Sequence, residues 1–299
     1  MSKLARYSSL IGGALALTAA FSSPAIAQND AEPTQLPPVE VTAQNIHEVV
    51  RAFVADVSEV HERGGQIARF DTRICPGVVN LPAAFAQTLN DQIARAAYGA
   101  GRAVGRPGCV PNVLVIFTDD SDRLANDLAD AHPSAFAFYV AMNENAHSAL
   151  AAFRAPGQTV RTWYMARKTQ GIGQAFPGNA PRNSLYNTNS RLSSGYATVI
   201  NRSIIVVDTS RLGPIKLLAL GDYLAMIALA RIDTTASTEH LDTILNLFSA
   251  PEDARPDSLS AWDEAYLRGV YSARPNSATT YLHVNEIASR MARRVAQTQ

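Results

Sequence analysis

The sequence has no excess of charge of either sign: 26 Lys and Arg residues stand against 26 Asp and Glu residues. Proteins that bind nucleic acid usually carry a strong basic excess, so this balance argues against a nucleic-acid partner. A long apolar run is also missing after the first 27 residues. Because a transmembrane helix needs about 20 apolar residues, we expect no segment of the remaining chain to span a bilayer.

The usual catalytic signatures are missing as well. The chain has no G-x-S-x-G nucleophile motif, no phosphate-binding G-K-[ST] loop and no G-x-G-x-x-G after a strand-like segment. Its histidines fall on separate elements and none forms an i, i+4 pair, so they indicate surface or core residues rather than metal ligands: His47, His61, His132, His147, His240 and His283. We therefore expect no cofactor and no bound metal.

Cysteine is scarce, with Cys75 and Cys109 as the complete set. Both lie in Pro-Gly turns, "ICPG" and "RPGCVPN". An isolated pair in an oxidising compartment is most simply a disulfide, and this is our prediction. A reactive thiol is the alternative, although no helix N-terminus or basic cluster in the sequence would activate either one.

The N-terminus has the pattern of a secretory signal peptide. Lys3 and Arg6 precede the apolar run "LIGGALALTAAF", and Ala25-Ile26-Ala27 provides an A-x-A cleavage site. Residues 1–27 are therefore expected to be removed on export to the periplasm or beyond. Residues 28–44 are Pro-rich and polar, which predicts a flexible leader. Residues 45–299 are then expected to form a single globular domain.

Hydrophobic periodicity predicts an alternation of helices and strands along that domain. Helices are expected at 45–62, 81–104, 121–130, 214–232, 260–272 and 279–297, and strands at 66–75, 112–120, 159–168 and 195–211. Ser121 or Asp122 is expected to cap the third helix, and Ser260 with Asp263 is expected to form a capping pair at the start of the fifth. The continuous apolar runs "NVLVIF" and "SIIVVD" are typical of strands that are buried on both faces. The sequence therefore predicts an α/β (α+β) fold, in which helices cover a small mixed β-sheet.

The stretch "GDYLAMIALARID", 221–233, follows the last strand and predicts a helix buried on nearly all sides. This order of elements, with the later "TILNLFSAPEDARPDSLSAWDEAYLRGVY", resembles uncharacterised secreted bacterial proteins of a zincin-like, metallopeptidase-like type. The resemblance implies that 222–226 would correspond to the H-E-x-x-H zinc motif. Met226 cannot replace a histidine ligand and Tyr223 cannot replace the glutamate base, so the resemblance implies a scaffold without the enzyme. A plain core helix is the alternative interpretation. In both cases the buried Asp222 needs a partner, expected from the long polar loop at 169–194.

Acidic residues follow two of the predicted strands. Carboxylates at the carboxyl ends of strands can form a site in open α/β sheets. They could hold Mg²⁺ or Ca²⁺, or simply cap helices and turns. If they converge, two of them could share the acid and base roles of a hydrolase, with these candidates: Asp119, Asp122, Asp208 and Asp222.

The long polar loop offers the second candidate surface, because aromatic and Arg side chains dominate binding hot spots. The candidate contact residues in and before it are Trp163, Tyr164, Arg182, Tyr186 and Arg191. The function expected from the sequence is that of an exported, non-enzymatic protein that binds a periplasmic or envelope partner. The alternative is a hydrolase with a dispersed acidic site.

Overall fold

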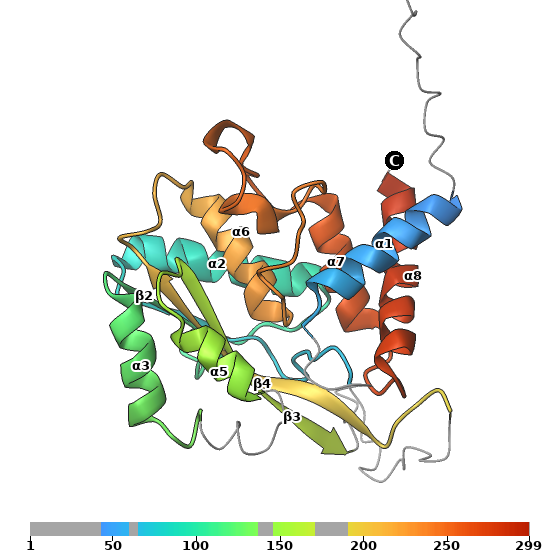
Figure 1. Ribbon diagram of the computed structural model, residues 1–299, viewed down its shortest axis with the longest axis horizontal. Coiled ribbons are helices and arrows are strands. Elements are labelled where there is room, and N and C mark those ends of the chain that lie inside the picture. Colours follow the sequence, from blue (N-terminus) through green and yellow to red (C-terminus); the bar gives the residue numbers. More distant parts are fainter. Residues whose placement is uncertain (1–42, 60–64, 137–145, 171–190, 299) are drawn as a thin grey trace, which may run out of the picture. The chain divides into compact units, whose positions relative to one another are not determined.

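A computed structural model describes residues 43–59, 65–136, 146–170 and 191–298 (Figure 1). All of them belong to one unit of the chain, Val41–Gln299. The expected signal peptide, residues 1–27, lies outside the described residues, as does most of the expected leader, 28–44. The expected loop at 169–194 is described only at its two ends.

A four-stranded mixed sheet lies at the centre of the fold, in the order β1-β2-β4-β3. The strands are β1 (Pro76–Val79), β2 (Val113–Thr118), β3 (Val160–Gln170) and β4 (Tyr196–Asp208). Strand β4 is parallel to β2 and antiparallel to β3, and β1 and β3 are the two edge strands. The two continuous apolar runs form the two inner strands, because an inner strand is covered on both faces. The predicted fold class, a small mixed sheet covered by helices, is confirmed.

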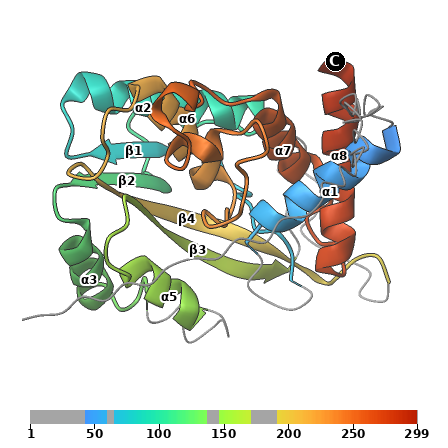
Figure 2. The ribbon, with the colours of Figure 1, turned by 45° about the horizontal axis from the view of Figure 1, so that its top comes forward.

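Helices cover both faces of this sheet (Figure 2). One apolar core lies between the sheet and the larger group of helices, and a second, smaller core lies on the other face under α3 and α5. The smaller group is α3 (Ser121–Ala131) and α5 (Ala146–Arg154); the larger group is α1 (Ala43–Val57), α2 (Ala83–Gly99), α6 (Leu217–Leu229), α7 (Ala261–Ser272) and α8 (Thr280–Thr298). Two short 3-10 turns, Ile244–Leu247 and Glu252–Ala254, lie between α6 and α7.

The helix that was expected at 214–232 is α6, and its burial is confirmed. Every residue from Ala219 to Leu229 is buried. A side chain at Gly221 would collide with Gln92 of α2, because a Cβ atom there would lie 2.7 Å from Gln92 Cγ. The glycine thus allows α6 and α2 to pack closely above the sheet.

The predicted strand at 66–75 is wrong. The segment makes isolated bridges at Arg69 and Ile74, but it contains no strand. Gln66, Ile67 and Ala68 are all buried, so the alternation of buried and exposed residues that marks a half-buried strand does not hold. The segment instead runs under α7, where Arg69 Nη1 donates to the carbonyls of Val270 and Ala273 at 2.6 and 2.9 Å.

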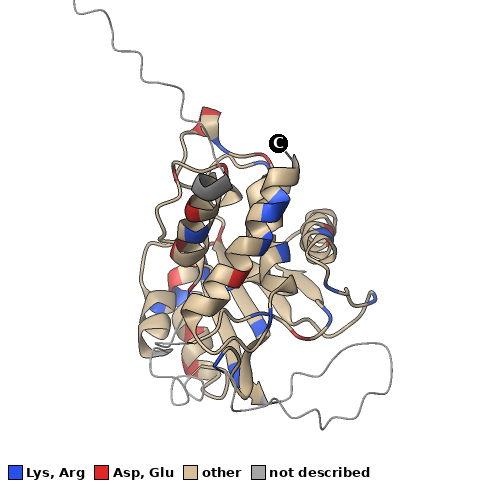
Figure 3. Ribbon diagram, turned by 90° about the vertical axis from the view of Figure 1, so that its right-hand side faces the viewer, with Lys and Arg blue, Asp and Glu red and all other residues tan. Residues whose placement is uncertain are grey.

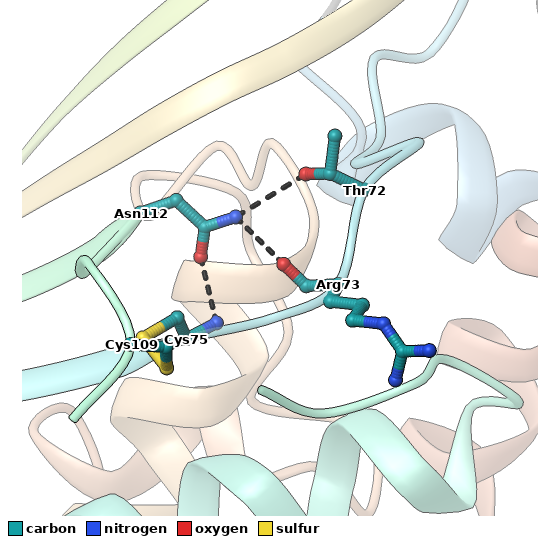
Figure 4. Close-up of a disulfide and its surroundings, with 5 residues drawn as sticks. All are labelled: Thr72, Arg73, Cys75, Cys109 and Asn112. Carbon is teal, nitrogen blue, oxygen red and sulfur yellow. Dashed lines mark hydrogen bonds between the residues drawn. A yellow bond between two sulfur atoms is a disulfide. The ribbon is translucent and has the colours of Figure 1, made fainter. Parts of the chain in front are cut away.

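The predicted disulfide between Cys75 and Cys109 is present, with a Cα–Cα distance of 6.2 Å (Figure 4). Asn112 organises the backbone beside it. Its Oδ1 accepts from the Cys75 N–H at 2.8 Å, and its Nδ2 donates to the Arg73 carbonyl at 2.9 Å. The disulfide therefore joins the start of β1 to the turn that leads into β2.

The helix caps agree with the sequence at α7 and differ at α3. Ser260 and Asp263 form the expected reciprocal capping box. At α3 the expected cap was Ser121 or Asp122, but Asp120 is the capping residue and accepts from the Arg123 N–H at 3.0 Å. The side chains of Ser121 and Asp122 have other partners, described below. None of the helices in the described ranges combines the length and apolar character needed to cross a membrane.

Candidate functional site

Two of the four candidate carboxylates converge at the carboxyl ends of β2 and β4. Arg211 joins them: its Nη2 lies 2.9 Å from Asp122 Oδ2, and its Nη1 lies 2.7 Å from Asp208 Oδ2. Asp122 also forms an ion pair with Arg161, whose side chain has no exposed area. The remaining donors of Arg161 go to Ser121 Oγ and to the carbonyls of Phe153 and Ala155.

This arrangement keeps Asp208 ionised. Burial alone would raise the pKa of its carboxyl group, but hydrogen bonds from Ser210 and Ser121 and the charge of Arg211 outweigh that effect, so the pKa lies below its ordinary value. Both carboxylates are thus bound to arginine and to neighbouring donors. The cluster ties α3, β3 and β4 together, and its carboxylates are poorly suited to proton transfer.

The other two candidate carboxylates lie elsewhere. Asp119 is exposed at the end of β2. Asp222 lies on α6, on the opposite side of the sheet from α3, where its Oδ2 accepts from the Leu259 N–H at 3.1 Å. This partner is a backbone amide that precedes α7, whereas most of the long loop, from which a partner was expected, lies outside the described residues. Burial raises the pKa of Asp222, although the Leu259 amide and the charge of Arg95 act against the shift.

The segment 222–226 shows no catalytic arrangement. Met226 is fully buried in the core, and Tyr223 packs edge-on against Phe248 at a centroid distance of 4.8 Å. In the parts of the chain that the structure describes, no three His, Cys, Asp or Glu side chains gather as a metal site would require. His283 is also buried, and its Nδ1 accepts from the Ile67 N–H at 3.1 Å.

A groove of about 580 Å³ lies along the outer side of β3. One wall comes from α5, and the other from Tyr223, Phe248 and the segment that follows α6. The lining residues are Glu59, Ala149, Ala152, Phe153, Gln158, Thr159, Val160, Thr162, Trp163, Tyr164, Tyr223, Arg231, Ile232, Asp233, Thr234, Thr235 and Phe248.

A nearly buried ion pair lies in this groove. Arg231 Nε is 3.3 Å from Glu59 Oε2, and the Arg231 side chain is 7% exposed. The guanidinium also lies over the ring of Tyr164, 5.5 Å from its centroid. Burial raises the pKa of Glu59 while Arg231 lowers it, and burial lowers the pKa of Arg231 while Glu59 raises it. Each charge therefore depends on the other, as expected of a pair that is withdrawn from water.

The backbone of β3 presents hydrogen-bonding groups to the same groove. The Asp208 N–H donates to the Thr159 carbonyl at 2.8 Å, so these two residues form a hydrogen-bonded pair of the antiparallel ladder. Bonded and non-bonded pairs alternate along such a ladder. The N–H and C=O groups of Val160, Thr162 and Tyr164 therefore point away from β4, and no described strand pairs with them.

The candidate contact residues are only partly brought together. Trp163 and Tyr164 line the groove, but Trp163 is mainly a core residue: its ring stacks on Phe136 and its Nε1 donates to the Ala135 carbonyl at 3.1 Å. Arg191 is exposed beyond β3. The remaining two, Arg182 and Tyr186, lie outside the described residues.

Sequence reasoning missed Glu59, Arg231 and Asp233. The first two are 172 positions apart, and no local pattern links them. Comparison with protein-family models, with curated proteins and with solved structures gives no significant match.

Proposed function

We propose that this chain is an exported, non-enzymatic protein that binds an extended segment of a periplasmic or envelope protein along the outer edge of β3. The disulfide and the lack of a membrane-spanning helix among the described residues are compatible with a protein outside the cytoplasm. The zincin-like interpretation remains part of this proposal, with α6 as a helix in the catalytic position that carries no metal ligand.

The groove beside β3 carries the proposal. An edge strand with outward-facing amides and carbonyls can accept a further strand, and side pockets then select alternate side chains of the added peptide. The structure provides both parts: the backbone groups of Val160, Thr162 and Tyr164, and walls on either side of them. The exposed residues Thr234 and Thr235 leave the mouth of the groove polar and accessible.

A hydrolase that uses Asp119, Asp122, Asp208 and Asp222 is less well supported. A carboxylate pair that divides acid and base roles needs one group with a raised pKa next to one that stays ionised. Asp208 has a lowered pKa and shares Arg211 with Asp122, while Asp222, whose pKa is raised, lies across the sheet from both. No pair therefore combines both properties in one place.

The experiment begins with photo-crosslinking in cells from position 235 in the groove, and from Tyr98 as a control. Tyr98 lies on α2 and is 79% exposed. A partner segment that is crosslinked from position 235 alone is then made as a synthetic peptide. Its binding is measured to the wild type and to the variants Thr162→Ala and Thr162→Pro.

Thr162→Pro removes the outward N–H that the added strand would use, and proline is tolerated on an edge strand when its nitrogen faces outward. Thr162→Ala loses the same hydroxyl but keeps the N–H, so it is the matched control. We expect Thr162→Pro to weaken peptide binding about tenfold or more, because a bound strand loses a hydrogen bond and meets the proline ring. Equal affinity of the two variants would refute strand addition at this edge.

A further inference from the structure

Acidic residues are missing from one long part of the chain. The chain has 26 Asp and Glu residues, yet none lies between Asn145 and Val207. That part forms α5, β3 and β4 in the structure. It contains these basic residues: Arg154, Arg161, Arg167, Lys168, Arg182, Arg191 and Arg202. Arg182 lies outside the described residues. In a chain that is neutral overall, positive charge is therefore concentrated in this part of the sequence.

Two of these basic side chains have structural roles. Arg154 pairs with Asp130 of α3 at 2.5 Å, and Arg161 is buried against Asp122. Arg167, Arg191 and Arg202 are exposed instead, and no carboxylate of the described residues lies within ion-pairing distance of them. Their charge is therefore directed to the solvent.

The register of the sheet places these charges on both faces of the hairpin end. Arg167 lies near Arg202, because its Nε donates to Oδ1 of the neighbouring Asn201 at 3.2 Å. Lys168 points to the opposite face, where its Nζ lies 4.8 Å from the centre of the Tyr196 ring. Figure 2 shows that this end of β3 and β4 extends beyond β1 and β2 toward the start of α8.

The chain before β4 connects the hairpin with the start of α8. The Ala278 N–H donates to the Leu192 carbonyl at 3.2 Å, and Ser193 bridges to Ser277. Two apolar side chains stand out from this junction: Leu192 is 57% exposed, and Tyr281, in the first turn of α8, is 67% exposed. Leu192 directly follows the exposed Arg191 in the chain, so an apolar and a basic side chain are adjacent at this junction.

We propose that the exposed side chains of Arg167, Arg191 and Arg202, with Leu192 and Tyr281, form a docking surface for an anionic lipid bilayer. Peripheral membrane contacts combine apolar side chains that enter the interface with Lys and Arg side chains that neutralise headgroups. Both components occur here. The rest of the chain has an excess of acidic residues, so an anionic surface would be attracted to this side of the molecule and repelled by the remainder. The exposed leucine favours a bilayer over a nucleic acid, because an apolar side chain gains by entering a lipid interface and has no such role at a phosphate backbone.

The test uses the protein purified after export, with its mature N-terminus determined. Binding to phosphatidylcholine vesicles is compared with binding to vesicles that also contain phosphatidylglycerol, at low and high salt. We expect binding only to the anionic vesicles, and a steep loss with added salt because surface charges are screened. Equal binding to both vesicle types, or retention on DNA without retention on vesicles, would overturn the proposal.

The variants locate the surface. The triple variant Arg167→Gln, Arg191→Gln, Arg202→Gln should reduce partitioning to anionic vesicles about a hundredfold, because each basic residue near such a surface contributes about fivefold. The matched control removes three exposed arginines elsewhere: Arg51→Gln, Arg106→Gln and Arg293→Gln. Figure 3 shows that the basic positions of α8 lie toward its C-terminal end, whereas Tyr281 is in its first turn.

The control should retain most of the wild-type binding. A similar loss in both triple variants would mean that charge alone matters and not its position, and would contradict the assigned surface. The double variant Leu192→Ser, Tyr281→Ser tests the apolar component. It should weaken binding in high salt more than in low salt, and unchanged binding in both would remove these two residues from the surface.

Discussion

Arg211 bridges Asp122 of α3 and Asp208 of β4, with N–O distances of 2.9 and 2.7 Å. Behind it, the side chain of Arg161 from β3 is completely buried against Asp122. Two arginines and two carboxylates thus connect α3, β3 and β4 where they meet at the carboxyl ends of β2 and β4. A place where open α/β sheets often bind ligands has become a structural joint in this chain.

Asp122→Asn is therefore expected to destabilise the fold strongly. The variant removes the carboxylate that is paired with the buried guanidinium of Arg161 and leaves only the more distant charge of Asp208. Breaking a fully buried pair costs about 3–5 kcal/mol, and we expect a loss of about 2–4 kcal/mol because Asp122 is 31% exposed. Urea denaturation of both proteins measures the difference.

Arg123→Gln is the matched control for that variant. It breaks the Arg123–Asp120 pair, whose side chains are 73% and 47% exposed, and exposed pairs contribute about 0–1 kcal/mol. If Asp122→Asn had no larger effect than this control, the cluster would not be the joint described here.

The Cys75–Cys109 disulfide closes a loop with a sequence separation of 34. We expect the double variant Cys75→Ser, Cys109→Ser to lose about 3–4 kcal/mol of unfolding free energy in the chain-entropy model. Wild-type protein that is unfolded with a reductant present should show the same midpoint as the double variant. Thiol alkylation in cells gives a second readout: export predicts that both cysteines become modifiable only after reduction. Free thiols in the exported protein would contradict the disulfide.

The features that the sequence predicted correctly depend on local or regular patterns. The Ser260–Asp263 capping box needs residues three apart, the buried strands β2 and β4 needed continuous apolar runs, and two cysteines allow only one internal pair. The predicted strand at 66–75 failed because Gln66, Ile67 and Ala68 are buried in succession, and because the segment makes only isolated bridges, such as that of Arg69 with Val199.

The groove could not be predicted, because it depends on contacts between distant segments. Glu59 follows α1 and Arg231 follows α6, and the fold brings them together beside β3. The partners of the acidic candidates could not be predicted for the same reason. Their residue types suggested a site, but the arginines that neutralise Asp122 come from positions 161 and 211, with no pattern to link them.

Gly221→Ala is expected to destabilise the protein although alanine favours helices. The new Cβ would lie 2.7 Å from Gln92 Cγ and 2.9 Å from Gln92 Cβ, so α6 and α2 would have to move apart. Overpacking of this kind costs about 1–3 kcal/mol. Gly99→Ala on α2 is the control, because its Cβ would meet nothing within 4 Å. It should be neutral or stabilise the protein by up to about 1 kcal/mol. Thermal unfolding compares the two, and equal effects would contradict the close approach of the helices.

His283 should make stability depend on pH. Burial and the nearby charge of Arg69 lower its pKa from 6.5 to about 4. Between these two values the unfolded chain binds a proton that the folded protein does not, so the stability that depends on neutral His283 is lost as pH falls from 6.5 to 4. His283→Asn keeps an acceptor for the Ile67 N–H but does not titrate. The stability advantage of the wild type over this variant should shrink by about 3 kcal/mol between pH 7 and pH 4.

Asp263 provides an opposite effect in the same pH range. Burial raises the pKa of its carboxyl group from 3.8 to about 6, so the folded protein holds a proton that the unfolded chain releases, and stability falls as pH rises through this window. In the wild type the two contributions oppose each other and should give a shallow profile. In His283→Asn only the contribution of Asp263 remains. The free energy of unfolding of this variant should therefore increase as pH falls from 6 to 4. Urea midpoints measured across this range would contradict the assignment if wild type and variant ran parallel.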